Sequence, residues 1–341
     1  MSVPVETHVV LAIDGGNIKT DVALVGSDGR LLALVRGGTS SPHALGFNGC
    51  VSVLSELVAD AAVGAGLTGE CQPVADVARV LLAGADLDEE VNALQTALGA
   101  LGWAPSLVVE NDTLALLRTG TDRGWGVAVV CGGGINAVGI AADGRAVRFP
   151  ALGAITGDWG GGHDVGIAAL SAANRSADGR EPRSTLEHAV PRHFGMTSPL
   201  EVARAIHFKE ISLEALAQLS PVVYEQAAVD DAARSILERV ADEVAVLAGT
   251  ALRRLDLAGA GADVVIGGGL MRDAPRWMIE RIERRVHATA ASATVVLAHE
   301  GPIVGAAILG LDAIAASPGA IARARAELQH AIGDLSQQLV G

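Results

Sequence analysis

Aromatic residues and cysteines are scarce in this chain. Phe, Trp and Tyr together make up 3% of the 341 residues, so the hydrophobic core has to be built from Ala, Val, Leu and Ile. The three cysteines, Cys50, Cys71 and Cys131, are widely spaced and include no Cys-x-x-Cys pair. This usage argues against a disulfide scaffold and a zinc knuckle, and it is typical of a reducing cytoplasm.

Signals for export, membrane insertion and polyanion binding are also missing. The first seven residues lack the basic and apolar regions of a signal peptide. No uninterrupted apolar run approaches the roughly 20 residues of a membrane span. The formal net charge of −14 would repel DNA, RNA and acidic membranes. We therefore expect a cytoplasmic protein without nucleic-acid or membrane partners. A nucleotide ligand stays possible, because a phosphate site depends on local N–H groups and a metal ion.

Glycine is abundant, at 42 residues, and it takes part in a pattern that occurs twice. Each copy has a β-rich run, a Gly-rich turn, a second run, an Asp-Gly-Arg turn and a third run. The first copy spans 8–36 and the second spans 126–149. The repeat predicts an internal duplication with one strand meander opening each half. Two unrelated hairpins are the alternative interpretation.

Strands and helices alternate after the first meander, which predicts parallel strands with both faces of the sheet covered. Residues 165–257 are strongly helical by pattern, with a polar surface excursion at 174–192, and a further helix is expected at 302–311. Apolar residues at helical spacing predict an amphipathic C-terminal helix that must dock on the protein, through Ile321, Leu328, Ile332, Leu335 and Leu339.

Three Gly-rich turns follow predicted strands, at Asp14–Asn17, Gly132–Gly134 and Gly267–Gly269. Glycine lets the backbone approach a phosphate closely, and free N–H groups in such turns bind anions. The first two turns are predicted to hold a phosphate chain and the third to lie against a nucleoside. Neither a P-loop nor a Gly-x-Gly-x-x-Gly fingerprint is present.

Two acidic residues and one unusual loop are the remaining candidates for chemistry. Asp14 ends the first strand, where it can hold Mg²⁺ through water. Asp112 lies between a strand and a helix, where a carboxylate can accept a hydroxyl proton or simply cap the helix. In the loop 157–164, Asp158 can bind sugar hydroxyls and Trp159 can stack on a sugar ring, or the Trp fills a gap in the core.

These motifs together resemble the BadF/BadG/BcrA/BcrD-type ATPase family, which includes N-acetylglucosamine kinases. The resemblance runs from His8 to about Ala315 and rests on four segments: Ile13–Asp21, Leu82–Asp86 with Glu110–Asp112, Cys131–Asn136, and Gly301–Ala307. It implies a duplicated, ribonuclease-H-like α/β fold of the actin/hexokinase superfamily with a central cleft. The implied domains are 1–118 and 119–318, the second with a helical insertion, and the helix 319–340 packs back on the first.

The resemblance also implies ligands and residue roles. Asp112 is the expected catalytic base, and Mg²⁺ is expected at Asp14. ATP is expected at the Gly-rich turns, through Asp14, Gly15, Gly16, Asn17, Lys19, Gly132, Gly133, Gly134, Gly267, Gly268 and Gly269. The sugar is expected at Ser41, His43, Asn111, Asp112, Gly133, Asp158 and Trp159. The family also implies a homodimer.

The chain departs from the family pattern at several polar positions. Ile18 replaces a hydroxyl residue of the first phosphate motif, and the second motif has Gly133 and Ile135 in place of Thr and Ser. Ser41 stands for an Asn, and the acidic residue and the serine that usually follow Asp158 are Trp159 and Gly161. Lost hydroxyls predict weaker binding of the ATP phosphates.

The leading hypothesis is an ATP-dependent kinase for an amino sugar such as N-acetylglucosamine or glucosamine. One alternative is an ATPase activator of a dehydratase or reductase, a role that needs cysteines placed to share an iron–sulfur cluster. The other is a sugar or nucleotide sensor with weakened catalysis, which the lost hydroxyls favour.

Overall fold

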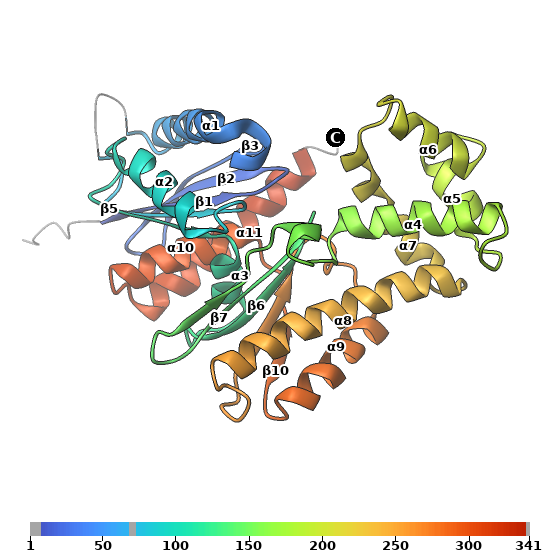
Figure 1. Cartoon of the computed structure of the whole chain (residues 1–341). Coiled ribbons are helices and arrows are strands. Elements are labelled where there is room, and N and C mark those ends of the chain that lie inside the picture. Colours follow the sequence, from blue (N-terminus) through green and yellow to red (C-terminus); the bar gives the residue numbers. More distant parts are fainter. Residues whose placement is uncertain (1–7, 68–72, 339–341) are drawn as a thin grey trace, which may run out of the picture. The chain divides into compact units, whose positions relative to one another are not determined.

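The computed structural model describes residues 8–67 and 73–338, and it divides into two compact units (Figure 1). Unit 1 contains the chain up to Gly124 together with everything from His299 onward, and unit 2 contains Trp125–Ala298. Residues 299–318, which the sequence predicts to belong to the second domain, lie in unit 1 instead. Helix α10 (Pro302–Ala313) packs on strand β1 (Val9–Gly15) and helix α3 (Thr113–Gly120), all of which belong to unit 1.

Unit 1 has a five-stranded mixed sheet in the order β3-β2-β1-β4-β5. Strands β1, β2 (Thr20–Gly26) and β3 (Leu31–Gly37) are antiparallel. Strands β4 (Val77–Leu82) and β5 (Ser106–Asn111) run parallel to β1. The expected meander is therefore present, followed by the expected parallel strands.

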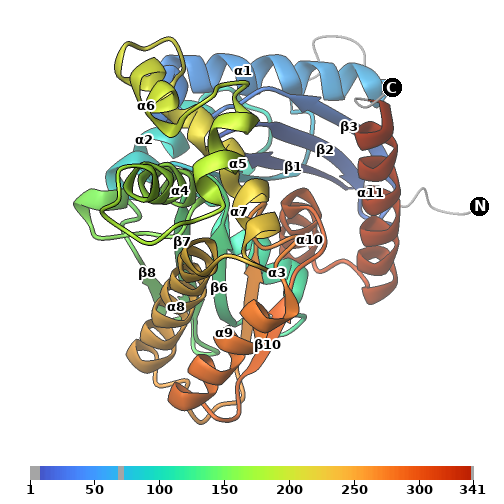
Figure 2. The ribbon, with the colours of Figure 1, turned by 90° about the vertical axis from the view of Figure 1, so that its right-hand side faces the viewer.

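Both faces of this sheet are covered because β1 and β2 are apolar on both sides. Leu11 and Ile13 face the cluster beneath α1 (Pro42–Gly64) and α2 (Asp88–Gly99), whereas Val10 and Ala12 face α10 and α11 (Pro318–Gln338). Helix α10 approaches so closely that a Cβ on Gly310 would lie 2.1 Å from Val10 Cγ1. Figure 2 shows α10 and α11 beside this sheet.

The C-terminal helix α11 docks on the core of unit 1, as its apolar spacing predicts. In this helix, Leu328 is buried and Ile321 and Ile332 pack beside it. Leu339 lies outside the described residues.

Helix α1 is long and apolar enough, by length and composition alone, to cross a membrane. Its buried side chains, among them Cys50 and Leu54, pack in the core of unit 1, so we interpret α1 as a core helix.

Unit 2 repeats the topology of unit 1. Its sheet has the order β10-β9-β6-β7-β8. Strands β6 (Gly126–Cys131), β7 (Ile135–Ile140) and β8 (Ala146–Arg148) are antiparallel, and β9 (Asp263–Gly267) and β10 (Thr294–Leu297) run parallel to β6. Because both halves contain a three-stranded meander extended by two parallel strands, the predicted duplication is confirmed.

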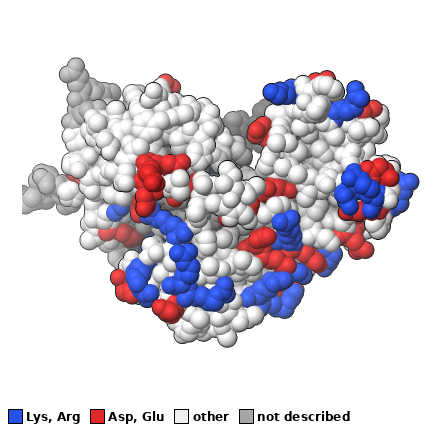
Figure 3. Space-filling model, viewed as in Figure 1, with Lys and Arg blue, Asp and Glu red and all other residues white. Residues whose placement is uncertain are grey.

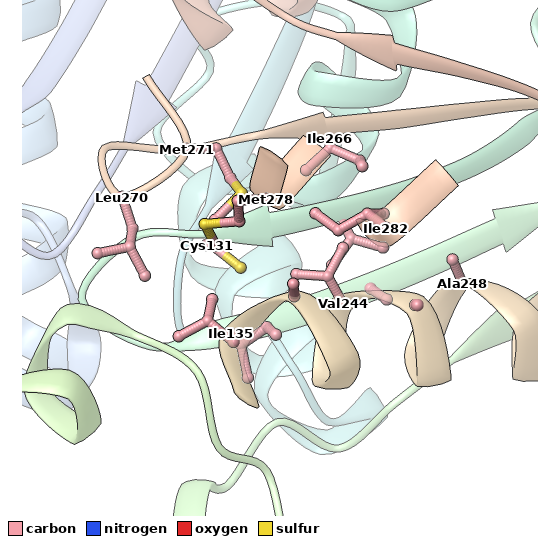
Figure 4. Close-up of a cluster of buried hydrophobic side chains, with 14 of the residues drawn as sticks. Cys131, Ile135, Val244, Ala248, Ile266, Leu270, Met271, Met278 and Ile282 are labelled. Atoms are coloured by element: carbon pink, nitrogen blue, oxygen red, sulfur yellow. The ribbon is translucent and has the colours of Figure 1, made fainter. Parts of the chain in front are cut away.

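The helices of unit 2 pack on this sheet and on one another. They are α4 (Gly162–Ala177), α5 (Leu186–His193), α6 (Pro199–His207), α7 (Ser220–Gln226), α8 (Asp231–Arg254) and α9 (Arg276–Thr289), with the 3₁₀ turns η1 (Gly153–Ile155) and η2 (Leu213–Leu219). Aliphatic side chains and two methionines form the core (Figure 4). The surface excursion expected at 174–192 is shorter than predicted, because Leu186 and Val190 in α5 are buried.

Candidate active site

Three strands of unit 1 end at one edge of its sheet. The parallel register pairs Gly15 of β1 with Leu82 of β4, and Leu82 with Asn111 of β5. Carboxyl ends of parallel strands are where α/β proteins place their ligands. Asp14, near the end of β1, and Asp112, directly after β5, therefore lie at the same edge of the sheet. The end of β4 lies between them.

Asp14 is buried, with 6% of its surface exposed. Burial raises the pKa of this carboxyl to about 7, although the ammonium of Lys19, 3.9 Å from Asp14 Oδ2, opposes the rise. Lys19 also pairs with Asp21, whose carboxylate receives two hydrogen bonds from Arg36, of 2.6 and 3.0 Å. A bound cation would relieve the cost of ionising Asp14 in this setting. Its carboxylate oxygens suit Mg²⁺, so the residue fits the predicted metal role.

The turn after Asp14 is tight. A Cβ on Gly15 would lie 2.4 Å from both Leu82 Cδ2 and Ser40 Oγ, so a larger residue would force these side chains to move. The N–H of Gly16 donates to the carbonyl of Lys19 at 2.9 Å, which closes the turn through Asn17 and Ile18. The Ile18 side chain is 84% exposed, so it does not belong to the core.

Asp112 occupies the N-cap position of α3, but its side chain makes no capping hydrogen bond. This weakens the alternative that it serves only as a cap. Burial raises the pKa of its carboxyl to about 7, and the negative charges of Asp14 and Asp86 add to the rise. A carboxyl group with a pKa near neutrality can take up and release a proton at physiological pH, as a general base must.

Asn111, expected at the sugar, forms hydrogen bonds inside unit 1. Its amide donates to Asp86 Oδ1 at 2.8 Å, and its oxygen accepts from the Thr113 N–H at 3.0 Å and the Thr113 hydroxyl at 2.6 Å. These contacts hold the strand end that carries Asp112. A role of Asn111 at the sugar remains a prediction.

Ser41 and His43 lie at the start of α1, in the same unit. The Ser41 hydroxyl is buried and has no hydrogen-bond partner among the described residues. An unpaired buried hydroxyl costs roughly 1–3 kcal/mol, so a polar ligand or water is the natural partner. His43 Nε2 lies 2.8 Å from Glu90 Oε1, and Glu90 was not predicted from the sequence. Glu90 lies in the first turn of α2, where its carboxylate accepts the N–H of Leu87 at 3.0 Å; the apolar Leu87 at the N-cap gives no capping-box signal in the sequence.

In unit 2 the turn Gly132–Gly134 follows β6. The carbonyls of Gly132 and Gly133 accept the N–H groups of Gly162 and His163 at 2.9 and 3.1 Å, so the start of α4 holds the turn. A Cβ built on Gly132, Gly133 or Gly134 would meet nothing within 4 Å. The open space above this backbone suits a phosphate group. The preceding Cys131 side chain points into the hydrophobic cluster of Figure 4.

The third glycine turn packs on the second. Gly268 has a φ of +101°, and a Cβ there would lie 2.2 Å from the Cys131 carbonyl oxygen. The N–H of Leu270 donates to the same oxygen at 3.0 Å, and the Tyr224 hydroxyl donates to the Leu270 carbonyl at 2.5 Å. The structure therefore brings Gly267–Gly269 and Gly132–Gly134 together within unit 2, as one nucleotide site requires.

Asp158 and Trp159 lie in the loop before α4. The Thr156 hydroxyl donates to Asp158. Trp159 packs partly against the core of unit 2, and the guanidinium of Arg239 lies 3.9 Å from its ring centroid. One face of the ring is thus already occupied by a cation, an interaction of about 0.5–2 kcal/mol. Stacking of Trp159 on a sugar stays a prediction.

The chain belongs to the BadF/BadG/BcrA/BcrD ATPase family, whose sequence profile matches residues 11–310. It is 29% identical over 214 residues to the N-acetylmuramic acid/N-acetylglucosamine kinase of Clostridium acetobutylicum, covering 63% of this chain and 69% of that protein. It is 26% identical over 258 residues to the N-acetyl-D-glucosamine kinase of Dictyostelium discoideum, covering 73% and 81%. The resemblance noted from the sequence is confirmed.

Solved structures confirm the fold. A putative N-acetylglucosamine kinase from Chromobacterium violaceum matches with a TM-score of 0.69 and 22% identity, over 89% of this chain and 98% of that one. A ROK family glucokinase from Streptomyces griseus, in complex with glucose and AMPPNP, matches with a TM-score of 0.55 and 16% identity, over 89% and 99%. The chain therefore has the same fold as these sugar-kinase structures.

Proposed function

We propose that this protein is an ATP-dependent sugar kinase that transfers the γ-phosphate of ATP to a hydroxyl of an amino sugar, N-acetylglucosamine or glucosamine being the favoured substrates. The two homologues named above support the sugar class. The observation that carries the proposal is Asp112, a carboxyl with a pKa of about 7 at the strand end that the family uses for its base.

Asp112 has one chemical task in this proposal. Its carboxylate accepts the proton of the sugar hydroxyl while that oxygen bonds to the γ-phosphorus of ATP. The bond from the γ-phosphorus to the bridging oxygen breaks, and ADP leaves with that oxygen. The partly buried, acidic setting that raises the pKa of Asp112 makes its carboxylate a better proton acceptor than an exposed aspartate.

The remaining residues bind and orient the two substrates. The backbone at Gly132–Gly134 is open for phosphate oxygens, and Gly267–Gly269 packs beside it for the nucleoside. Asp14 would hold Mg²⁺, which when bound neutralises charge on the phosphates. Ser41 and His43 would contact the sugar. The buried hydroxyl of Ser41 has no hydrogen-bond partner among the described residues.

A coupled ADP-release assay tests the proposal. The panel contains N-acetylglucosamine, glucosamine, N-acetylmuramic acid, N-acetylmannosamine and glucose. Asp112→Asn should lower kcat by about 10²-fold or more, because positioned general bases contribute about 10²–10⁴. Asp60→Asn, which removes an exposed carboxylate of α1, is the matched control and should keep parent activity. Sugar-independent ADP release, or a normal kcat for Asp112→Asn, would contradict the proposal.

The two alternatives make different predictions. An activator with an iron–sulfur cluster needs reachable thiolates, but Cys50 and Cys131 are buried, and burial raises the pKa of the Cys50 thiol to about 11; Cys71 lies outside the described residues. A sensor would show heat of sugar binding without ADP release. A cytoplasmic location and a homodimer remain proposals, which fractionation and light scattering can check.

A further inference from the structure

A histidine and a glutamate from two different helices meet in unit 1. His43 lies in the first turn of α1 and Glu90 in the first turn of α2, and His43 Nε2 is 2.8 Å from Glu90 Oε1. The other oxygen of Glu90 accepts the backbone N–H groups of Asp86 and Leu87, at 3.1 and 3.0 Å. Three donors therefore fix this carboxylate, and the carboxylate in turn fixes the imidazole.

The protonation of this pair follows from its contacts. Burial alone would raise the pKa of Glu90, but the hydrogen bonds from His43 and from two backbone N–H groups bring it below its ordinary value. An ionised carboxylate can only accept hydrogen bonds, so His43 Nε2 must carry a hydrogen. In the neutral ring Nδ1 is then an acceptor. It lies against Gly84, where a Cβ would be 3.3 Å away, so that residue places no side chain over it.

The surroundings of the pair are concave and acidic. A hollow of about 320 Å³ lies between the starts of α1 and α2, lined by apolar Phe47, Ala93 and Leu94 and by Glu89 as well as by His43 and Glu90. Figure 3 shows acidic side chains gathered on unit 1. The first turn of α2 carries Asp88, Glu89 and Glu90. The hollow has room for part of a small polar ligand beside His43.

A metal ion is a competing explanation for this cluster. One ligand atom each of His43, Asp86 and Glu90 lie within 4.8 Å of one another. Hydrogen bonds already account for the arrangement, because Asp86 accepts from Asn111 at 2.8 Å and Glu90 accepts the three donors described above. A cation would have to displace the hydrogen that joins His43 to Glu90.

We propose that Glu90 is a positioning residue for the sugar: it holds the His43 ring with Nε2 as donor, so that Nδ1 accepts a hydrogen bond from a hydroxyl or amide N–H of the substrate. This proposal rests on the proposed function. It adds Glu90, which the sequence did not single out, to the residues expected at the sugar. It also states that His43 accepts a hydrogen bond from a donor group of the substrate. Glu90 accepts the backbone N–H of Asp86, and the Asp86 carboxylate accepts from Asn111, the residue before Asp112. Hydrogen bonds therefore link His43 to the strand end that carries Asp112.

Glu90→Gln is the informative variant because it keeps the shape of the side chain. Its single oxygen can still accept from the N–H groups of Asp86 and Leu87, which leaves its NH₂ facing His43. Nε2 must then accept, and the hydrogen moves to Nδ1. Asp88→Asn is the matched control, because it removes one carboxylate charge from the same turn without touching the His43 hydrogen bond or the lining of the hollow.

The experiment combines kinetics with ¹⁵N NMR of histidine-labelled protein, in which His43→Asn identifies the His43 signals. We expect the Nε2–H tautomer in the parent and in Asp88→Asn, and the Nδ1–H tautomer in Glu90→Gln. The KM for the sugar should rise about tenfold in Glu90→Gln with kcat within about twofold, and Asp88→Asn should stay near the parent. An unchanged tautomer or KM in Glu90→Gln would overturn the proposal.

Two further results separate this proposal from the proposed function. If the parent phosphorylates no sugar, the proposed function fails, and titration with N-acetylglucosamine then decides the role of His43. A shift of its Nδ1 signal supports the positioning role, and no shift overturns it. A His43 signal that changes on adding EDTA would show a bound cation and overturn the hydrogen-bonded arrangement.

Discussion

Ile18 offers a direct test of how this chain binds ATP. It lies in the turn between β1 and β2, where the family resemblance leads us to expect a hydroxyl residue, and it is 84% exposed. The Ile18 side chain therefore does not point into the core. An apolar side chain stands at the surface of a turn predicted to face the nucleotide phosphates. We expect Ile18→Thr to restore a hydrogen bond to a phosphate oxygen.

The magnitude follows from the exposure of the side chain. A hydrogen bond to a charged group contributes about 1.5–3 kcal/mol, and about 1.4 kcal/mol corresponds to a tenfold change in affinity. Ordering an exposed threonine consumes part of this gain, so the KM for ATP should fall about tenfold. Because Ile18 buries little surface, the free energy of unfolding should change by no more than about 0.5 kcal/mol.

The control is Ile18→Val, which has the shape of threonine without its hydroxyl. Steady-state kinetics at saturating sugar and a melting curve on each variant give the result. Ile18→Thr should lower the KM for ATP and leave the KM for sugar nearly unchanged, whereas Ile18→Val should match the parent. If the two variants have the same KM for ATP, the hydroxyl does not reach the phosphates and the reasoning fails.

Three other predictions concern Asp112, α11 and Gly161. The pKa of Asp112 rises from 3.8 to about 7 on folding, so its penalty to stability develops between about pH 4 and pH 7 and is largest above pH 7. Asp112→Asn should therefore raise the Tm at pH 8 more than at pH 4, and kcat/KM of the parent should fall below about pH 7; a pH-independent Tm difference contradicts this. Truncation after Ala316 removes Leu328 and its neighbours from the core of unit 1 and should lower the Tm by about 5 °C or more, whereas a parent-like melting curve would show that α11 contributes nothing. Gly161→Ser would place a Cβ 2.2 Å from the Gly133 carbonyl oxygen and should lower the free energy of unfolding, measured by chemical denaturation, by about 1–3 kcal/mol. An unchanged free energy of unfolding would show that the turn moves to accept the side chain.

The strands and the duplication were predictable because their signals are local. Alternating apolar residues and Asp-Gly-Arg turns lie within a few residues of one another, and both meanders form as expected. The place of α10 was not predictable, since its apolar sequence fits either unit and only the close approach at Gly305 and Gly310 selects unit 1. The His43–Glu90 hydrogen bond joins residues 47 positions apart, and no periodicity carries that information.

Two expected departures from the family pattern, at Gly133 of the second phosphate motif and at Gly161 before α4, lie against each other in the structure. Gly161 lies so close to Gly133 and Gly134 that a Cβ on it would come 2.3 Å from the Gly134 Cα, so the serine usual at this position cannot be accommodated while the turn keeps its course. A Cβ on Gly133 itself would meet nothing within 4 Å. The loss of the serine at position 161 is therefore a consequence of how the turn packs against the start of α4, whereas the loss of the hydroxyl at position 133 is not imposed by packing. The Gly132 N–H already donates to the Gly134 carbonyl at 2.9 Å. We therefore propose that the backbone of Gly133 and Gly134, with the open space above it, binds phosphate in place of side-chain hydroxyls.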